Sequence, residues 1–88
     1  MVKWSIPAKI VLKYIHDYIG QDSQYYAKKV TEEILERSQI LDSFPMKGRI
    51  VPEIEDENIR EIFVYSYRII YEIKKDSIYV LGVIHSNP

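Results

Sequence analysis

With 88 residues and an apolar fraction of 47%, the chain is predicted to form a single domain over residues 1–88. Its 12 lysines and arginines and 13 aspartates and glutamates give a net charge of -1, which excludes a polybasic nucleic-acid binder and leaves room for a local basic face. There is no cysteine, which excludes disulfides, thiolate metal sites and cysteine nucleophiles.

The first 20 residues predict a short strand followed by a helix. Residues 2–4 alternate apolar and polar side chains, which is typical of a strand. Ser5 is a suitable N-cap, Pro7 fits the first turn of a helix, and Gly20 is a natural helix end. The apolar side chains of this helix recur at helical spacing and are expected to face the core. They are Ile10, Val11, Tyr14, Ile15, Tyr18 and Ile19.

A second, longer helix is predicted next. Asp22 or Ser23 would cap its start, and Pro45 would end it. Its expected buried residues are Tyr26, Ala27, Val30, Ile34 and Leu41. Because only a short turn separates the two helices, they should pack as a helical hairpin. Residues 46–57, with a glycine, a proline and an acidic run, are predicted to form a connecting loop.

The rest of the chain predicts three strands. Residues 59–65, 67–74 and 78–84 are dense in Ile, Val and Tyr, and Lys75-Asp76 is a tight turn between the last two. The predicted order is β-α-α-β-β-β. This order indicates an α+β fold with the two-helix hairpin packed on one face of a mostly antiparallel sheet.

The predicted hairpin places two chemically useful side chains near each other. If Lys75-Asp76 is the turn, residue 74 faces residue 77, so Arg68 lies opposite Val83 and His85 opposite residue 66. With a turn of even length, Arg68 and His85 share one face of the sheet. A turn of odd length would place them on opposite faces.

Such a pair has a clear chemical use on RNA. An arginine can bind phosphate through two hydrogen bonds and stabilise the negative charge of a transition state. A histidine titrates near neutral pH and can protonate a leaving 5′ oxygen. Glu53, in the predicted loop, is a candidate base for the 2′-hydroxyl of RNA. Arg68, His85 and Glu53 would then suffice for cleavage without a metal.

Each of these residues also has a purely structural interpretation. Arg68 can form an ion pair with Glu61 or Glu72 on neighbouring strands. His85 can be a solvent-facing residue at a strand end, and Glu53 can be a solvated loop carboxylate. The sequence alone leaves these alternatives open.

Common motifs of other protein classes are missing from the sequence. It contains no phosphate-binding loop, no GxSxG and no HExxH, and His16 and His85 lack metal-ligand spacing, so we expect no metal and no cofactor. There is neither a signal-peptide pattern nor an apolar run near the roughly 18 residues that cross a bilayer. We therefore expect a cytoplasmic protein without a membrane partner.

Four segments, in order and spread over nearly the whole chain, resemble the RelE/ParE toxin superfamily. They are Ala8 with Ile15, Tyr18, Ile19 and Asp22-Ser23; Phe44-Pro45 with Gly48-Arg49-Ile50-Val51-Pro52-Glu53; Ile59-Arg60-Glu61 with Tyr67-Arg68-Ile69-Ile70-Tyr71; and Ile78-Tyr79-Val80-Leu81-Gly82-Val83-Ile84-His85. The last three are similar to the family patterns P-x-x-G-R-x-V-P-E, I-R-E…Y-R-I-x-Y and I-x-V-L-x-V-x-H. Each segment is a loose match, and the four together are more specific.

The resemblance implies a toxin that a cognate antitoxin wraps and neutralises, as a hetero-oligomer. Three functions are compatible with it. One is RelE-like cleavage of mRNA on translating ribosomes, and another is ParE-like inhibition of DNA gyrase by protein binding without catalysis. The third is a weakened toxin that mainly retains antitoxin binding.

The resemblance also implies roles for particular residues. Arg68 matches the strand arginine of RelE-like nucleases, and Glu53 and His85 match the loop base and the late histidine acid of one nuclease branch. The lysine cluster of the most basic RelE nucleases has no counterpart here. The candidates for contacts with RNA phosphates are Arg49, Arg60 and Lys47.

Overall fold

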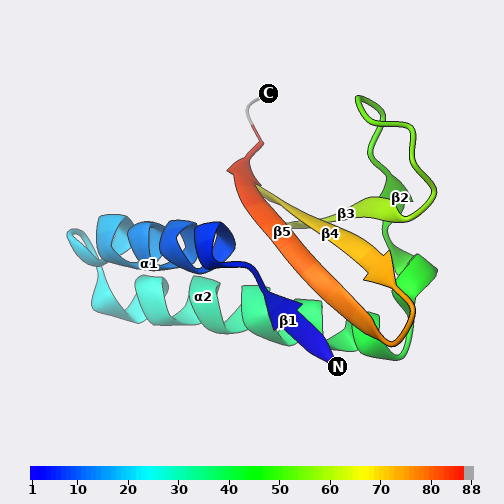
Figure 1. Ribbon diagram of the computed structural model, residues 1–88. Helices are drawn as coiled ribbons and strands as arrows, with labels where there is room; N and C mark the ends of the chain where they lie inside the picture. Colours follow the sequence, from blue (N-terminus) through cyan, green and yellow to red (C-terminus); the bar gives the residue numbers. More distant parts are fainter. Residues whose placement is uncertain (87–88) are drawn as a thin grey trace.

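The structure, a computed structural model, describes residues 1–86 and confirms the predicted α+β fold (Figure 1). Two helices pack against a mixed five-stranded sheet. None of the described helices is long and apolar enough to cross a membrane. The elements are β1 (Val2–Trp4), α1 (Ile6–Gly20), α2 (Gln24–Gln39), β2 (Arg49–Ile50), β3 (Ile59–Val64), β4 (Tyr67–Lys74) and β5 (Ser77–His85).

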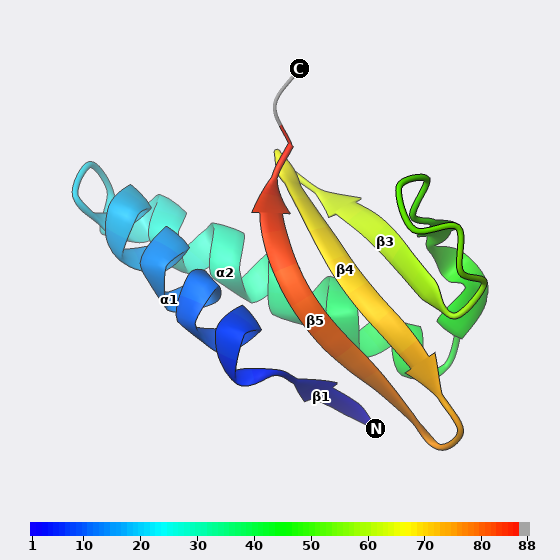
Figure 2. The ribbon, with the colours of Figure 1, turned by 45° about the horizontal axis from the view of Figure 1, so that its top comes forward.

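The sheet brings the two ends of the chain together. Its strand order is β1-β5-β4-β3-β2, with β1 parallel to β5 and every other pair antiparallel. The strand that begins the chain is therefore an edge strand beside the one that ends it. The helical hairpin covers one face of this sheet, with α2 crossing behind the strands and α1 lying next to β5 (Figure 2).

Both helices start where the sequence predicts, and one of the caps also ties a helix to the sheet. The Ser5 hydroxyl accepts a hydrogen bond from the Ala8 N–H at 3.2 Å and donates one to the Leu81 carbonyl of β5 at 3.1 Å. Ser23, rather than Asp22, caps α2, because its hydroxyl accepts a hydrogen bond from the Tyr26 N–H at 3.2 Å. The Ser5 cap, which also binds β5, fixes the direction in which α1 leaves β1.

The core lies between the sheet and the hairpin, and it uses only part of the predicted helical stripes. Ile15 is buried, as predicted, but Ile10, Tyr14 and Tyr18 are 63–70% exposed. The prediction for those three residues is wrong because the hairpin projects beyond the sheet, so that α1 packs mainly on α2 and β5 (Figure 1). Of the core residues predicted for the second helix, Ala27 and Ile34 are buried in α2, Val30 is partly buried and Tyr26 is exposed. Leu41 is buried as well, but it lies in a 3-10 helix, Ile40–Asp42, that follows α2.

The segment between α2 and β3 is more ordered than the sequence predicts. Helix α2 ends at Gln39, before Pro45, and two 3-10 helices follow, Ile40–Asp42 and Pro45–Lys47. The predicted loop then contains β2, in which Arg49 pairs with Glu61 of β3. A two-residue strand is too short to show an alternating pattern, which is why the sequence does not predict it.

The β4–β5 hairpin contains a bulge, which counting residues back from the turn does not predict. Lys74 pairs with Ser77, as expected from the turn. An irregularity at Ile70/Tyr71 then shifts the pairing by one residue. Beyond this irregularity Arg68 pairs with Ile84, and Tyr67 pairs with His85. The predicted pairing of Arg68 with Val83 is therefore wrong.

Candidate functional site

Arg68 lies on the face of the sheet that the helices leave uncovered, and carboxylates bind its guanidinium on two sides. Its Nε donates to Glu61 Oε1 at 2.7 Å. Its two terminal nitrogens donate to the two oxygens of Glu53, at 3.1 Å and 3.0 Å. This is the two-bond geometry in which an arginine would hold a phosphate. The Glu53 side chain thus occupies the position that a phosphate would need.

Glu61 anchors this network from inside the sheet. Its side chain is buried, and its second oxygen accepts from Arg49 Nε at 2.7 Å, so the carboxylate lies between two guanidinium groups. Arg49 also lies over the ring of Phe63, 5.2 Å from its centroid. The structural interpretation in which Arg68 pairs with Glu61 is confirmed. The pairing of β2 with β3 is what brings Arg49 into the same cluster.

Glu53 is an exposed loop residue whose charge is stabilised by its partner. The hydrogen bonds from Arg68, followed by a backbone hydrogen bond, hold the pKa of Glu53 below its usual value. A carboxylate with a lowered pKa is a weaker base. This environment makes Glu53 less suited to remove a proton from a 2′-hydroxyl.

His85 lies on the other face of the sheet. Tyr67 pairs with His85, and neighbouring residues of a strand point to opposite faces, so His85 lies on the face of Tyr67 and away from Arg68. Its ring meets the Tyr67 ring edge to face, with centroids 5.3 Å apart. Both residues line a pocket of about 360 Å³ beside α1, which also includes Tyr14 and Tyr18. The prediction that Arg68 and His85 share a face is wrong.

The other predicted phosphate ligands are dispersed or already engaged. Arg60 donates from Nη1 to the Gly48 carbonyl at 3.0 Å and from Nε to the Glu57 carbonyl at 2.9 Å, so it holds the loop between β2 and β3. Lys47 ends the second 3-10 helix and makes no ion pair within residues 1–86. Among those residues there is also no group of three His, Cys, Asp or Glu that could hold a metal.

The sequence analysis missed the central role of Glu61 in this cluster. Its position had a usable signal, because a strand's period of two places Glu61 on the same face as Phe63. That signal supports an ion pair of Glu61 with Arg68 on the neighbouring strand, whereas the place of Arg49 depends on β2, which the sequence does not predict. On this face Arg49, Arg68, Glu53 and Glu61 form a network in which each charged group has a partner of opposite charge.

Comparison with known proteins identifies a family and a solved structure with a similar fold. A family model described as the ParE toxin of type II toxin-antitoxin system, parDE, matches residues 2–87. A solved structure of the chromosomal ParDE TA system from P. aeruginosa has a similar fold, with a TM-score of 0.80 and 21% sequence identity over 98% of this chain and 95% of that chain. Among curated proteins, no sequence matches.

Proposed function

Because this chain belongs to the ParE toxin family of type II toxin–antitoxin systems, we propose that it inhibits DNA gyrase by binding the enzyme, without catalysing a reaction of its own. A cognate antitoxin neutralises it by forming a complex with it. The alternative is RelE-like cleavage of mRNA on translating ribosomes.

The observation that carries the proposal is the separation of Arg68 from His85 by the sheet. Cleavage of RNA needs a base, a cation and an acid around one phosphate, within hydrogen-bond reach of the reacting atoms. The bulge places His85 beside the helices and Arg68 on the uncovered face. Glu53, the candidate base, already neutralises Arg68. No single phosphate can therefore contact all three groups in this arrangement.

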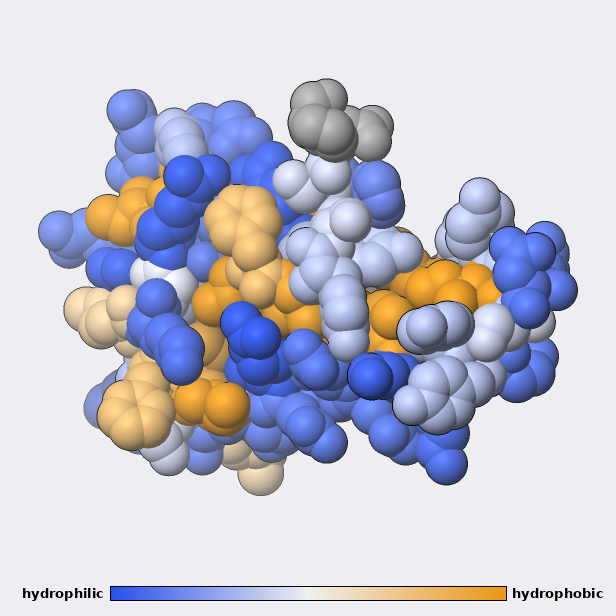
Figure 3. Space-filling model, turned by 180° about the vertical axis from the view of Figure 1, so that it is seen from behind, coloured by the Kyte–Doolittle hydropathy of each residue, from blue (hydrophilic) through white to orange (hydrophobic). Residues whose placement is uncertain are grey.

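The surface of the protein also fits a function in protein binding. Ile6, Ile10, Tyr14 and Tyr18 follow one another at a spacing of four along α1, and they are 63–72% exposed. Seen from behind, apolar side chains form a band that crosses the molecule between hydrophilic regions (Figure 3). Large exposed apolar side chains in a small domain are typical of surfaces that contact other proteins.

The test uses variants that remove the candidate acid and base and leave the buried charges in place. His85 and Glu53 are exposed, so His85→Ala and Glu53→Gln should fold normally. The purified wild-type chain and both variants should inhibit supercoiling by gyrase to the same extent, and the cognate antitoxin should relieve the inhibition. Arg68 is unsuited to this test on its own, because its loss also removes a partner of Glu61.

A parallel assay addresses the alternative. The wild-type chain is added to a translating extract, and the 5′ ends of the mRNA are mapped. New ends that disappear with His85→Ala, together with unchanged supercoiling, would refute the proposal in favour of a nuclease. Normal growth on expression without antitoxin, with neither effect in vitro, would indicate a weakened toxin.

A further inference from the structure

Gly82 lies inside β5 at a position where neither the backbone nor the packing requires a glycine. A Cβ added there would meet no atom of the described structure within 4 Å, apart from the chain neighbours of Gly82. The bulge beside it does not require a glycine either, because the φ of Gly82 is not positive. A glycine inside a strand weakens the strand, and one that the fold does not need indicates close approach by another backbone.

This open position lies on the face of the sheet that the helices leave uncovered. Helix α2 lies behind the strands in Figure 2, so this face is turned toward the viewer. Gly82 pairs with Ile70 of β4, and two residues further along Ile84 pairs with Arg68, so all four residues share the face. Ile84 is 47% exposed, and Phe63, which pairs with Arg68 from β3, is 43% exposed. We call Gly82, Ile70, Ile84 and Phe63 the Gly82 patch.

The charged groups beside the Gly82 patch already neutralise one another. Arg68 pairs with Glu53 and Glu61, and Arg49 pairs with Glu61 from its other side. A phosphate or an acidic peptide would have to displace one of these carboxylates before it could reach a guanidinium group. The patch therefore matches a partner surface that is apolar and carries no net charge.

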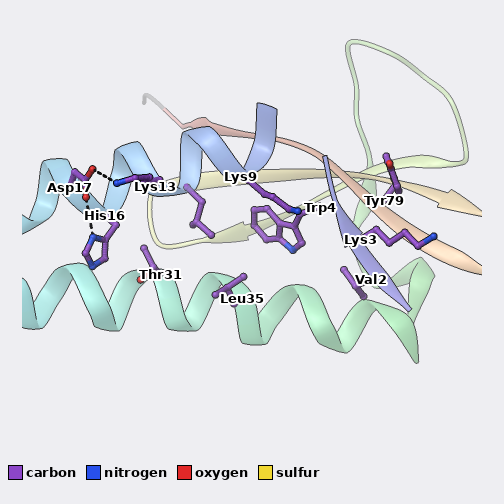
Figure 4. A pocket seen from close by; sticks show the side chains of 11 residues that line it. Val2, Lys3, Trp4, Lys9, Lys13, His16, Asp17, Thr31, Leu35 and Tyr79 are labelled. Atoms are coloured by element: carbon purple, nitrogen blue, oxygen red, sulfur yellow. Dashed lines mark hydrogen bonds and ion pairs between the residues drawn. The ribbon is translucent and has the colours of Figure 1, made fainter. Parts of the chain in front are cut away.

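The larger hollow of the molecule has a different character. A groove of about 860 Å³ lies between β1 and the two helices, and Lys3, Lys9 and Lys13 are the cationic residues of its lining (Figure 4). Lys3 and Lys9 form no ion pair in the described part of the chain. That groove favours an anion, so the two surfaces suit ligands of different charge.

We propose that an apolar, uncharged segment of gyrase crosses the uncovered face of the sheet at Gly82, with its backbone close to β5. The inference rests on the proposed function, because it takes gyrase as the target and names the surface that contacts it. The missing side chain of Gly82 leaves room for the partner's backbone, and the exposed side chains of Ile84 and Phe63 pack against its apolar side chains.

The first test adds carbon atoms at Gly82. Gly82→Ala and Gly82→Val should fold like wild type, because the space is open and β-branched residues favour strands. The added atoms should hold the two backbones apart. The toxin concentration that half-inhibits supercoiling by gyrase should therefore rise by about tenfold or more for Gly82→Val, and by less for Gly82→Ala.

Gly20→Ala is the matched control, because it adds the same methyl group at the end of α1. The atoms within 4 Å of a Cβ at Gly20 belong to the flexible side chain of Gln24. This variant should change the inhibition of gyrase by less than about twofold. Thermal unfolding of the same samples should give both Gly82 variants a melting temperature at or above that of wild type, because each removes a glycine from a strand.

A second test uses the wild-type chain and so does not depend on how any variant folds. The toxin is deuterated except for its isoleucine methyl groups, and magnetisation is transferred to these groups from protonated gyrase in the complex. The methyl signals of Ile84 and Ile70 should lose intensity. Those of Ile10, which is exposed on α1, should lose less.

The outcomes separate this inference from the proposed function. If the wild-type chain inhibits supercoiling and a folded Gly82→Val inhibits it equally, the inference is wrong while the proposed function stands. If the signal loss occurs at Ile10 and not at Ile84, the contact surface is α1 and the inference is also wrong. If the wild-type chain does not inhibit gyrase, the proposed function itself fails. A dimer of the free chain that Gly82→Val disrupts would identify a second copy as the occupant and overturn the inference.

Discussion

Replacing Arg68 by methionine should destabilise the fold because it removes one of the two cations that surround a buried carboxylate. The side chain of Glu61 is 0% exposed and that of Arg68 is 19% exposed. Breaking a buried ion pair by removing one partner typically costs about 3–5 kcal/mol. Arg49 still holds one oxygen of Glu61, so we take the lower end, about 3 kcal/mol. For a domain of this size the melting temperature should fall by about 12–24 °C.

Removing the buried charge together with its partner should restore most of that loss. Glu61→Leu in the Arg68→Met background leaves an apolar pair on a face that already includes Phe63, and Arg49 and Glu53 are exposed enough to be solvated by water. Replacing both members of a buried pair by apolar residues is often close to neutral, so the double variant should lie within about 1 kcal/mol of wild type.

Urea unfolding followed by circular dichroism measures both variants, and the double variant should be about 2 kcal/mol more stable than Arg68→Met alone. A double variant as unstable as Arg68→Met alone, or a single variant within about 0.5 kcal/mol of wild type, would refute the reasoning. The double variant also tests whether activity needs the guanidinium of Arg68, because its stability should be close to that of wild type. It lacks the guanidinium of Arg68, so a protein that acts by binding gyrase should still inhibit supercoiling.

Three further predictions concern the loop and the helices. Gly48→Ala should destabilise the fold by about 2 kcal/mol in thermal unfolding, because the added Cβ would lie 2.6 Å from the hydroxyl of the buried Tyr71. The pKa of Glu53 is lowered in the folded state by Arg68, so its stabilisation is present above the unfolded pKa and is lost as the pH falls through the folded value. The difference in unfolding free energy between wild type and Glu53→Gln should therefore shrink between about pH 6 and pH 3, and a constant difference would contradict this. Ser23→Ala should cost about 1 kcal/mol through the lost cap of α2, and Ser23→Asp should not.

Local signals in the sequence predicted most of the elements. The capping serines Ser5 and Ser23, the helix end at Gly20 and the turn at Lys75-Asp76 are all confirmed, and each depends on a few neighbouring residues. Such features are set by short-range hydrogen bonds and backbone preferences, which a sequence displays directly.

The site could not be predicted in the same way because it depends on register. Leu81 of β5 is an extra residue between Val80, which pairs with Tyr71, and Gly82, which pairs with Ile70, and it reverses the face of every residue beyond it. Gly82 beside it is the one local signal of a bulge, and an isolated glycine in a strand does not fix the register. This one irregularity separates Arg68 from His85. The exposure of Tyr14 on α1 has a comparable origin, because helical periodicity identifies an apolar stripe but not how far the helix extends past the sheet.

The pairing of β1 with β5 sets an order of events during synthesis. Of the five strands, residues 2–4 are synthesised first, and the strand they pair with, residues 77–85, is synthesised last. The helical hairpin can form from contacts close in sequence while the chain grows, but this edge of the sheet has to wait. A nascent or prematurely terminated chain that lacks residues 77–85 therefore has no partner for its first strand.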